Sequence, residues 1–177
     1  MKRISLLLGL AAIVPLVGCQ SGHYGSGQKA SATLESRSGS STKGTINFVS
    51  QGHDVLVTGT ISGLRPNAEH GFHVHEKGDC SAPDATSAGG HFNPDGKAHG
   101  MPGHGHGHGA HHAGDMPNIK TDANGNAVYS AKVSGLTLDA GKHGIVGKSV
   151  VIHRDPDDYK SQPAGNSGPR IACGLIK

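Results

Sequence analysis

The sequence predicts an all-β fold, in which eight short strands form an antiparallel sandwich or barrel with two long loops. In the segments that hold most of the large apolar residues, apolar and polar side chains alternate with a period of two, as in a half-buried strand. The 29 glycines and the absence of tryptophan suit short strands and many turns better than long helices. Periodicity and composition therefore favour the same fold class.

Turn-forming residues separate the eight strand segments. The segment 45–49 places Ile46 and Phe48 on one face, as a half-buried strand requires. The step Asn124-Gly125 favours the tight turn of a hairpin between the segments on either side of it. The predicted strands cover residues 32–37, 45–49, 55–61, 70–76, 118–122, 127–133, 149–153 and 171–176.

Two long stretches lack the strand pattern, residues 77–117 and residues 154–170. A structureless loop of about forty residues is uncommon in a compact domain unless it is functional or is held together by something other than a core. The first stretch holds seven of the chain's 14 histidines. We therefore expect bound metal and a covalent cross-link to order it.

Residues 1–18 have the pattern of a secretory signal peptide. Lys2 and Arg3 precede an apolar run over residues 4–17, which is too short to span a bilayer comfortably. Leu16-Val17-Gly18-Cys19 resembles a bacterial lipobox, whose cysteine becomes the lipid-modified first residue of the mature protein. An ordinary signal peptide followed by an incidental cysteine is the alternative. Residues 19–29 are polar and rich in Gly and Ser, so they predict a flexible tether before a domain at residues 30–177.

These features predict a lipoprotein anchored to a membrane of the bacterial cell envelope, facing the periplasm. Gln20, which follows Cys19, is not a signal for retention in the inner membrane. Removal of residues 1–18 takes away Lys2 and Arg3 and lowers the formal net charge from +3 to +1. A nearly neutral protein lacks the excess of positive charge with which nucleic-acid-binding proteins contact phosphates, so we expect no nucleic-acid partner.

Cys19, Cys80 and Cys173 form an odd number of cysteines for an exported protein. If Cys19 carries lipid, Cys80 and Cys173 remain as a pair, and an oxidising compartment makes a disulfide the default. Closing that loop of 94 residues would contribute about 4 to 5 kcal/mol through the entropy of the unfolded chain. Two thiols that serve as metal ligands are the alternative.

The chemistry of the chain centres on Gly71-Phe72-His73-Val74-His75-Glu76. Successive side chains of a strand point to opposite faces, so His73 and His75 share one face while Phe72 and Val74 share the other. This arrangement predicts half of a metal site on one face and core on the other. An edge strand with two solvated histidines is the alternative for this motif taken alone.

Further motifs favour the metal site over an edge strand with solvated histidines, because they supply more ligands and match a known family in order and spacing. With these motifs the chain closely resembles copper/zinc superoxide dismutase of the bacterial periplasmic lipoprotein type, from about residue 30 to residue 177. The resemblance implies a Greek-key β-sandwich or barrel with two functional loops. The motifs are Gly71-Phe72-His73-Val74-His75, Gly90-His91-Phe92-Asn93-Pro94, His112-Ala113-Gly114-Asp115, Ile152-His153 and Gly165-Asn166-Ser167-Gly168-Pro169-Arg170-Ile171-Ala172-Cys173-Gly174.

The resemblance implies a copper site and a zinc site that share one histidine, His91, as a bridging imidazolate. Imidazoles suit both ions, and an open four-nitrogen set serves a metal that cycles between two oxidation states. Three histidines and one aspartate form a closed tetrahedral set that suits zinc, which has no redox chemistry. The implied copper ligands are His73, His75, His91 and His153, and the implied zinc ligands are His91, His99, His112 and Asp115.

The assignment of His112 rather than His111 to zinc rests on the family's zinc loop, which has the form His-x-Gly-Asp. His112 satisfies this form and His111 does not. The Gly-His repeat over residues 103–109 is an insertion relative to the usual zinc loop, and it is either solvated low-complexity sequence or a segment that captures copper or zinc before delivery. For the other histidines we expect His70 to hydrogen-bond within the fold, and His53 and His143 to sit in turns.

The resemblance also implies roles for residues near the ions. Asp157 corresponds to the aspartate that hydrogen-bonds one copper histidine and one zinc histidine, and such partners fix the orientation of the rings. Arg170 corresponds to the arginine beside the open copper face, where a guanidinium can attract a small anion. Ala164 stands where many relatives have a threonine, so the lysines that steer the substrate are not carried over, and Lys160 is only a candidate.

The implied activity is the disproportionation of superoxide anion to dioxygen and hydrogen peroxide, with His91 and Arg170 as the catalytic residues. An envelope carrier of copper or zinc, with the same fold and no turnover, is the competing hypothesis. The intact copper ligands and Arg170 favour the enzyme, and the histidine repeat favours the carrier. The sequence leaves open whether the domain forms a homodimer.

Overall fold

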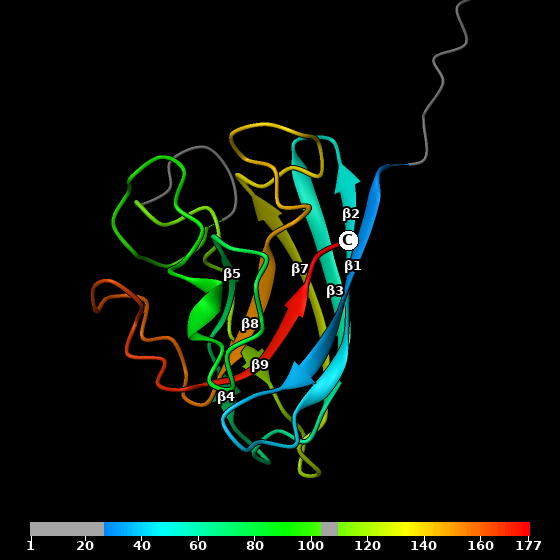
Figure 1. The fold of residues 1–177 in the computed structure, drawn as a ribbon, viewed down its shortest axis with the longest axis vertical. Coiled ribbons are helices and arrows are strands. Elements are labelled where there is room, and N and C mark those ends of the chain that lie inside the picture. The colour runs from blue at the N-terminus through cyan, green and yellow to red at the C-terminus, as the bar shows by residue number, and fades with distance from the viewer. Residues whose placement is uncertain (1–26, 104–109) are drawn as a thin grey trace, which may run out of the picture.

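A computed structural model describes residues 27–103 and 110–177, and in these two ranges the regular secondary structure is almost entirely β (Figure 1). The predicted signal peptide, Cys19 with its predicted lipid, and residues 104–109 of the Gly-His repeat lie outside the described residues. One turn of 3-10 helix covers Thr86–Ala88. The strands are β1 (Lys29–Ser36), β2 (Lys43–Gln51), β3 (Asp54–Ser62), β4 (Glu69–His70), β5 (Phe72–His75), β6 (Ile119–Lys120), β7 (Ala127–Ser134), β8 (Ser149–His153) and β9 (Arg170–Leu175).

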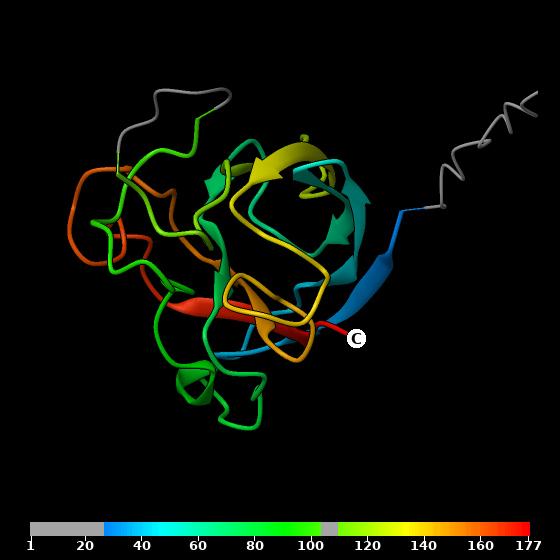
Figure 2. The same ribbon diagram turned by 90° about the horizontal axis from the view of Figure 1, so that it is seen from above.

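Seven strands form one antiparallel sheet in the order β5-β8-β9-β1-β2-β3-β7, and β4 pairs with β6 in a separate ladder. The chain passes from β3 to β5 and from β7 to β8, so it twice crosses from one end of this order towards the other. These long crossovers make a Greek key, and Figure 2 shows the strands curling around a common interior. The predicted all-β Greek-key class is confirmed. In the part of the chain that the structure describes, no helix has the length and apolar character needed to cross a bilayer.

The interior of the curled sheet is the hydrophobic core. Strand β1 shows the expected alternation, with Ala30, Ala32 and Leu34 buried between exposed neighbours. The rings of Phe72 on β5 and Tyr129 on β7 pack edge to face with centroids 5.0 Å apart, so the core joins the two end strands of the sheet. A fully buried phenylalanine contributes about 1.5 to 3 kcal/mol, which favours this closure over an open sheet.

The predicted strand 70–76 is divided at Gly71. The amide of Gly71 donates to the carbonyl of Asp155 at 2.8 Å, and the carbonyl of Gly71 accepts from the amide of His153 at 2.8 Å. The chain therefore changes partners there, and β4 pairs with β6 while β5 pairs with β8.

The predicted hairpin between residues 118–122 and 127–133 is only half correct. Its turn forms, because Gly125 adopts a φ of 76° and its amide donates to the carbonyl of Asp122 at 3.2 Å. Its two strands do not pair with each other, since β6 pairs with β4 and β7 pairs with β3. Tertiary pairing thus replaces the local ladder that the turn favoured.

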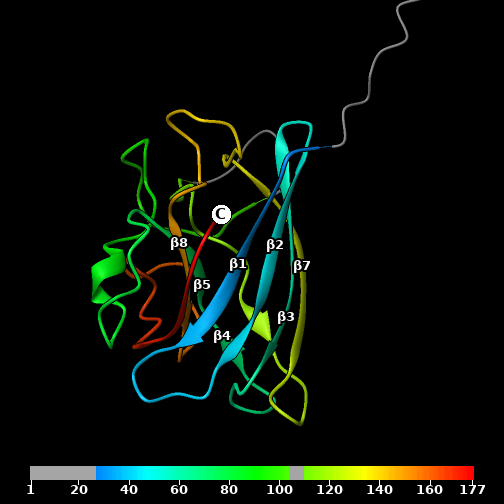
Figure 3. The same ribbon diagram turned by 45° about the vertical axis from the view of Figure 1, so that its right-hand side comes forward.

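Both long loops gather on one side of the sheet, beside β5 and β8 (Figures 1 and 3). The first of them lies along the free edge of β5. The amide of Phe92 donates to the carbonyl of Val74 at 2.8 Å, and the amide of Val74 donates to the carbonyl of Gly114 at 2.9 Å. Within this loop, Gly100 and Ala110, on the two sides of the Gly-His repeat, lie close together. A side chain at Gly100 would collide with the carbonyl oxygen of Ala110. Backbone pairing therefore orders part of this loop.

Candidate metal centre

The two histidines of β5 lie on one face of the strand and are fully buried. Phe72 and Val74, on the opposite face, belong to the hydrophobic core, as the alternation predicted. Every residue of β5 is buried because the long loops cover the face that carries His73 and His75. The alternative of two solvated histidines on an edge strand is therefore wrong.

Four histidines form the first candidate metal group, His73, His75, His91 and His153, with one ligand atom of each within 4.8 Å of the others. His153 ends β8 at an irregularity in its pairing with β9, and His91 faces His75 in an isolated bridge. The Nε2 atoms of His75 and His153 lie 3.4 Å apart. The four side chains that were predicted to bind copper are brought together.

Backbone carbonyls fix the orientation of two rings in this group. The Nδ1 atom of His75 donates to the carbonyl of Gly89 at 3.0 Å, and that of His153 donates to the carbonyl of Gly168 at 3.1 Å. With Nδ1 carrying the proton in both rings, each Nε2 is a free lone pair that points into the group. Metal-binding histidines are commonly held through the second nitrogen in this way.

The second candidate metal group consists of His91, His99, His112 and Asp115, also with ligand atoms within 4.8 Å of one another. The Asp115 carboxylate lies 2.8 Å from Nδ1 of His91, 3.0 Å from Nδ1 of His99 and 3.4 Å from Nδ1 of His112. Three imidazoles around one carboxylate match the set that was predicted to bind zinc.

His91 belongs to both groups and uses a different nitrogen in each. Its Nδ1 faces Asp115 and His112, at 2.8 and 3.4 Å, while its Nε2 is buried and has no hydrogen-bond partner. Its ring stacks on that of His73 with centroids 3.9 Å apart. One ring thus separates the two candidate sites, as a bridging ligand requires.

Unpartnered nitrogens test whether these residues fit metal ions. Nδ1 of His73, Nε2 of His91 and Nδ1 of His99 are buried and make no hydrogen bond, although the last lies close to Asp115. Buried polar atoms rarely stay unpaired, because each loses its contact with water. The atoms point into the two groups, so bound cations would satisfy them. The donor sets fit a four-nitrogen copper site and a tetrahedral zinc site.

Asp157 joins the two groups through their outer nitrogens. One carboxylate oxygen lies 2.8 Å from Nε2 of His73 and the other lies 2.9 Å from Nε2 of His99. Its own position is fixed by Asn118, whose side-chain oxygen accepts from the amide of Asp157 at 3.0 Å. The carboxylate therefore orients one ring from each group, which is the place predicted for it.

Burial sets the protonation of the first group. It lowers the pKa of His73, lowers those of His75 and His153 well below the ordinary value, and lowers that of His91 to about 4. Neutral imidazole is the form that binds metal, so burial favours ligation over protonation.

The carboxylates have the opposite effect on the second group. Burial would lower the pKa of His99, but Asp115 and Asp157 outweigh it and raise that pKa to about 9. The three neighbouring histidines outweigh burial at Asp115 and hold its pKa well below the usual range. Without metal, His99 therefore keeps a proton at neutral pH.

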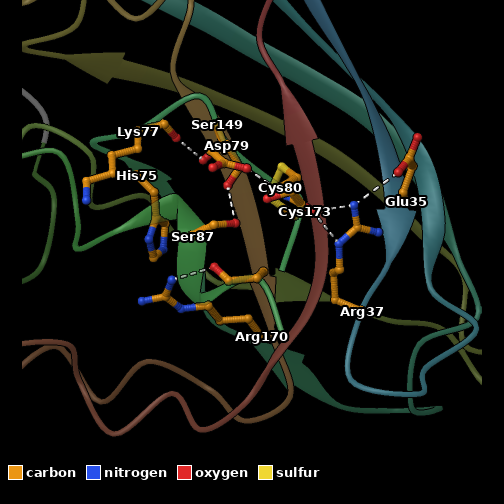
Figure 4. The surroundings of a disulfide bond; sticks show 12 residues. Glu35, Arg37, His75, Lys77, Asp79, Cys80, Ser87, Ser149, Arg170 and Cys173 are labelled. Atoms are coloured by element: carbon orange, nitrogen blue, oxygen red, sulfur yellow. Dashed lines mark hydrogen bonds and ion pairs between the residues drawn. A yellow bond between two sulfur atoms is a disulfide. The ribbon is translucent and has the colours of Figure 1, made fainter. Parts of the chain in front are cut away.

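Arg170 lies beside the first group. Its Nη1 donates to the carbonyl of Ala85 at 2.7 Å, and burial lowers its pKa without removing its charge (Figure 4). The charge contributes, after burial and the neighbouring histidines, to the lowered pKa of His75 and His153. A pocket of about 170 Å³ reaches His153 and is lined in part by Ala164, whereas the candidate Lys160 is exposed and does not line it.

The remaining histidines have smaller roles, and the expected disulfide forms. Nδ1 of His111 donates to the carbonyl of His112 at 2.7 Å, and His111 belongs to neither group. His70 hydrogen-bonds the carbonyl of His153 at 2.9 Å, within the fold as expected. Cys80 and Cys173 are joined in a disulfide, so their alternative role as metal ligands is wrong.

Three kinds of functional contact were not predicted from the sequence. The carbonyls of Gly89 and Gly168 are backbone groups, which leave no mark in the residue pattern. Gln162 accepts from the amide of His99 at 2.8 Å and donates to its carbonyl at 2.9 Å. Arg37 binds the carbonyl of Cys80, and no motif surrounds it.

Comparison with known proteins assigns this centre to a family. The copper/zinc superoxide dismutase family matches residues 42–176. The chain belongs to this family. Two crystal structures share the superoxide dismutase fold seen here, each at 39% sequence identity. The clock protein EA4 matches with a TM-score of 0.74 over 86% of this chain and 96% of its own. A double mutant of a SOD-like protein from Bacillus subtilis matches with a TM-score of 0.70 over 81% and 94%.

Relatives in this superoxide dismutase family come from distant organisms. Cu-Zn superoxide dismutase 2 of Aquifex aeolicus (strain VF5) is 45% identical over 143 residues, which cover 76% of this chain and 78% of the relative. Cu-Zn superoxide dismutase of Cordyceps militaris is 45% identical over 141 residues, which cover 75% and 88%. The family membership and the two histidine groups together support copper and zinc as the cofactors.

Proposed function

We propose that this protein is a copper/zinc superoxide dismutase in which the first group holds copper and the second holds zinc. The observation that carries the proposal is His91, whose two nitrogens face the two groups separately. A ring in this position can be shared by two ions, and a site for one stored ion does not need it.

The reaction joins two superoxide anions and two protons to give dioxygen and hydrogen peroxide. One superoxide loses an electron and the other gains one, so no further reductant is required. Bound copper supplies the one-electron redox chemistry, and bound zinc supplies a fixed positive charge without redox change.

The side chains of this chain supply the anion attraction and the proton. The Arg170 guanidinium is a permanent positive charge beside His75 and His153, and it draws a small anion to the first group. Nε2 of His91 is the atom that can hold a proton between the two halves of the reaction. This atom is buried and has no hydrogen-bond partner among the described residues, so it is free to take up a proton and to pass it to a peroxide oxygen.

The direct test is superoxide consumption by the protein loaded with copper and zinc, compared with Arg170→Ala. We expect rapid consumption by the wild type and a loss of about tenfold in the variant, whose anion attraction is removed. A protein that binds both ions in full and consumes no superoxide would be a metal carrier instead.

We propose a lipid anchor at Cys19, on the strength of the lipobox-like residues that precede it. The mature protein is then a lipoprotein of the bacterial envelope that faces the periplasm. Cys19→Ser should remove the lipid mass from the mature protein and shift it from the membrane fraction to the soluble fraction. An unchanged mass and an unchanged fractionation would refute the anchor.

We also propose that the Gly-His repeat captures metal for the adjacent site. The described residues on its two sides support this, because Gly100 meets Ala110 next to His99 and His112. Deletion of residues 103–109 should slow metal loading when copper and zinc are scarce, and should leave the activity of the fully loaded enzyme unchanged. Equal loading rates with and without the repeat would contradict this role.

A further inference from the structure

The segment 77–89, which we call the disulfide loop, carries a contact to the charged group of Arg170. Its Cys80 is bonded to Cys173 on β9, and its Ala85 is fully buried and accepts from Nη1 of Arg170 at 2.7 Å (Figure 4). The direction of the Arg170 guanidinium therefore depends on the position of this loop.

A second arginine holds the same loop from the opposite side. Figure 4 shows Arg37, which follows β1, directed at the backbone of Cys80. Its Nε and Nη2 lie 2.9 and 2.6 Å from the carbonyl oxygen of Cys80, and its side chain is only 15% exposed. Two donors from one guanidinium on one carbonyl make a directional contact that is stronger than a neutral hydrogen bond.

The residues around Arg37 join the loop to the start of β9. Nη1 of Arg37 donates to the carbonyl of Ser36 at 2.8 Å, which fixes the guanidinium plane. The amide of Ser38 donates to the carbonyl of Pro83 at 2.8 Å, and its hydroxyl donates to the carbonyl of Arg170 at 2.8 Å. The turn after β1 thus contacts both the disulfide loop and the backbone of Arg170 itself.

This attachment does not depend on the sulfur atoms. Arg37 contacts the carbonyl of Cys80, while the disulfide uses the side chain of the same residue. A pocket of about 220 Å³ is lined by Cys80, Cys173 and Glu35, so the disulfide borders solvent. If the disulfide were absent, the guanidinium contact would still hold the loop at the same residue.

We propose that Arg37 is a positioning residue, which holds the disulfide loop and thereby the Arg170 guanidinium in place independently of the disulfide. The inference rests on the proposed role of Arg170 in attracting the anion. It predicts that removal of the Arg37 side chain weakens anion binding modestly when the disulfide is intact and strongly when the disulfide is missing.

The test compares the wild type, Arg37→Met, the double variant Cys80→Ser with Cys173→Ser, and the triple variant. The first measurement is amide hydrogen exchange of residues 77–89. The second is the affinity of the copper- and zinc-loaded protein for azide, a small anion. With the disulfide intact, we expect Arg37→Met to weaken azide binding about twofold; in the serine background we expect about tenfold.

Matched variants separate positioning from general destabilisation. Arg37→Lys keeps one donor and should restore part of the loss, whereas Glu35→Gln removes only the exposed ion pair of Arg37 and should change neither measurement. If the serine variants do not fold, the comparison of Arg37→Met, Arg37→Lys and Glu35→Gln with the disulfide intact decides the matter. Unchanged loop exchange and unchanged azide affinity in Arg37→Met would overturn the proposal.

Arg170→Gln distinguishes a failure of this inference from a failure of the proposed function. If Arg170→Gln binds azide as the wild type does, the proposed role of Arg170 is wrong, and so is the positioning role that depends on it. If Arg170→Gln weakens azide binding while removal of Arg37 has no effect in the serine background, only the positioning role is wrong.

Discussion

At the scale of single residues, the backbone of Gly165 packs directly against two side chains of the metal centre. A side chain there would collide with the Asp157 carboxylate and would lie 2.7 Å from Nε2 of His99. Its φ of 64° lies in the left-handed region, which glycine adopts without strain. Only glycine lets Asp157 reach His99.

We predict that Gly165→Ala lowers both the melting temperature and the zinc content of the purified protein. The matched control is Gly39→Ala, since Gly39 has a φ of 71° but nothing within 4 Å of the added carbon. Both variants pay roughly 1 kcal/mol for the left-handed backbone, and only the first displaces Asp157. Equal zinc contents in the two variants would show that the close approach has no role in zinc binding.

The adjacent pair His111 and His112 gives a second prediction at this scale. Nδ1 of His112 faces Asp115 and His91, whereas Nδ1 of His111 bonds a backbone carbonyl. His112→Ala should therefore lose most of the bound zinc, and His111→Ala should retain it, as measured by metal analysis after dialysis. The reverse order would move the zinc ligand to His111.

The side chains of the two metal groups could be predicted from the sequence, and the groups that orient them could not. His73, His91 and Asp115 stand out because they lie in short motifs that match a known family in order and spacing. The carbonyls that orient His75 and His153 belong to glycines whose role is fixed only by the folded backbone. A sequence motif shows which side chains can bind a metal. The tautomer of each histidine ring depends on contacts that form only in the folded protein.

At the scale of elements, the two long loops hold each other through the backbone of a metal-group residue. The side-chain amide of Gln162 pairs with the amide and the carbonyl of His99, as a neighbouring strand would. The loop after β8 thus contacts His99 at its backbone, through Gln162, and at its ring, through Asp157. His99 cannot move without disturbing both contacts.

We predict that Gln162→Glu speeds the release of zinc to a chelator by about fivefold. Glutamate keeps the acceptor for the His99 amide but loses the donor to the His99 carbonyl, and one hydrogen bond is worth about 1 kcal/mol. Gln28→Glu is the control, because the Gln28 side chain is also exposed and hydrogen-bonds Asp139 instead of a residue of either metal group. Release rates that are the same in all three proteins would exclude a role for Gln162.

The partners of short strands were the part of the fold that the sequence predicted poorly. Alternation located β1, β2, β3 and β7 to within a few residues. It did not predict that Gly71 would separate β4 from β5, because that division depends on hydrogen bonds to Asp155 and His153, more than eighty residues away. Long-range pairing overrides local preference where a strand is only two residues long.

At the scale of the whole molecule, the buried histidines make the stability of the metal-free protein depend on pH. An unfolded histidine takes up a proton near pH 6.5, whereas His91 in the folded state does so only near pH 4. His75 and His153 are lowered as well. The unfolded state therefore binds more protons below pH 6.5, and stability falls as the pH falls from there towards 4.

Because the pKa of His99 is raised to about 9, the metal-free protein also loses stability on the alkaline side. Its contribution is fully present below pH 6.5 and disappears as the pH rises through 9. We predict that the melting temperature of the metal-free protein is highest near pH 6.5 to 7 and falls in both directions, as measured by calorimetry. Replacement of the exposed His53 by Gln should leave this profile unchanged. A flat profile between pH 5 and 7 would contradict neutral burial of the first group.

The meeting of Gly100 and Ala110 makes this position a natural point for insertions. A segment whose two attachment points touch adds nothing to the span that the fold must cover, and doubling its length costs only about 0.6 kcal/mol in closure entropy. Peptides of other composition could therefore replace the repeat without shifting His99 or His112. Under the capture role proposed for the repeat, such replacements would change the rate of metal loading and leave the residues of the two metal groups in place.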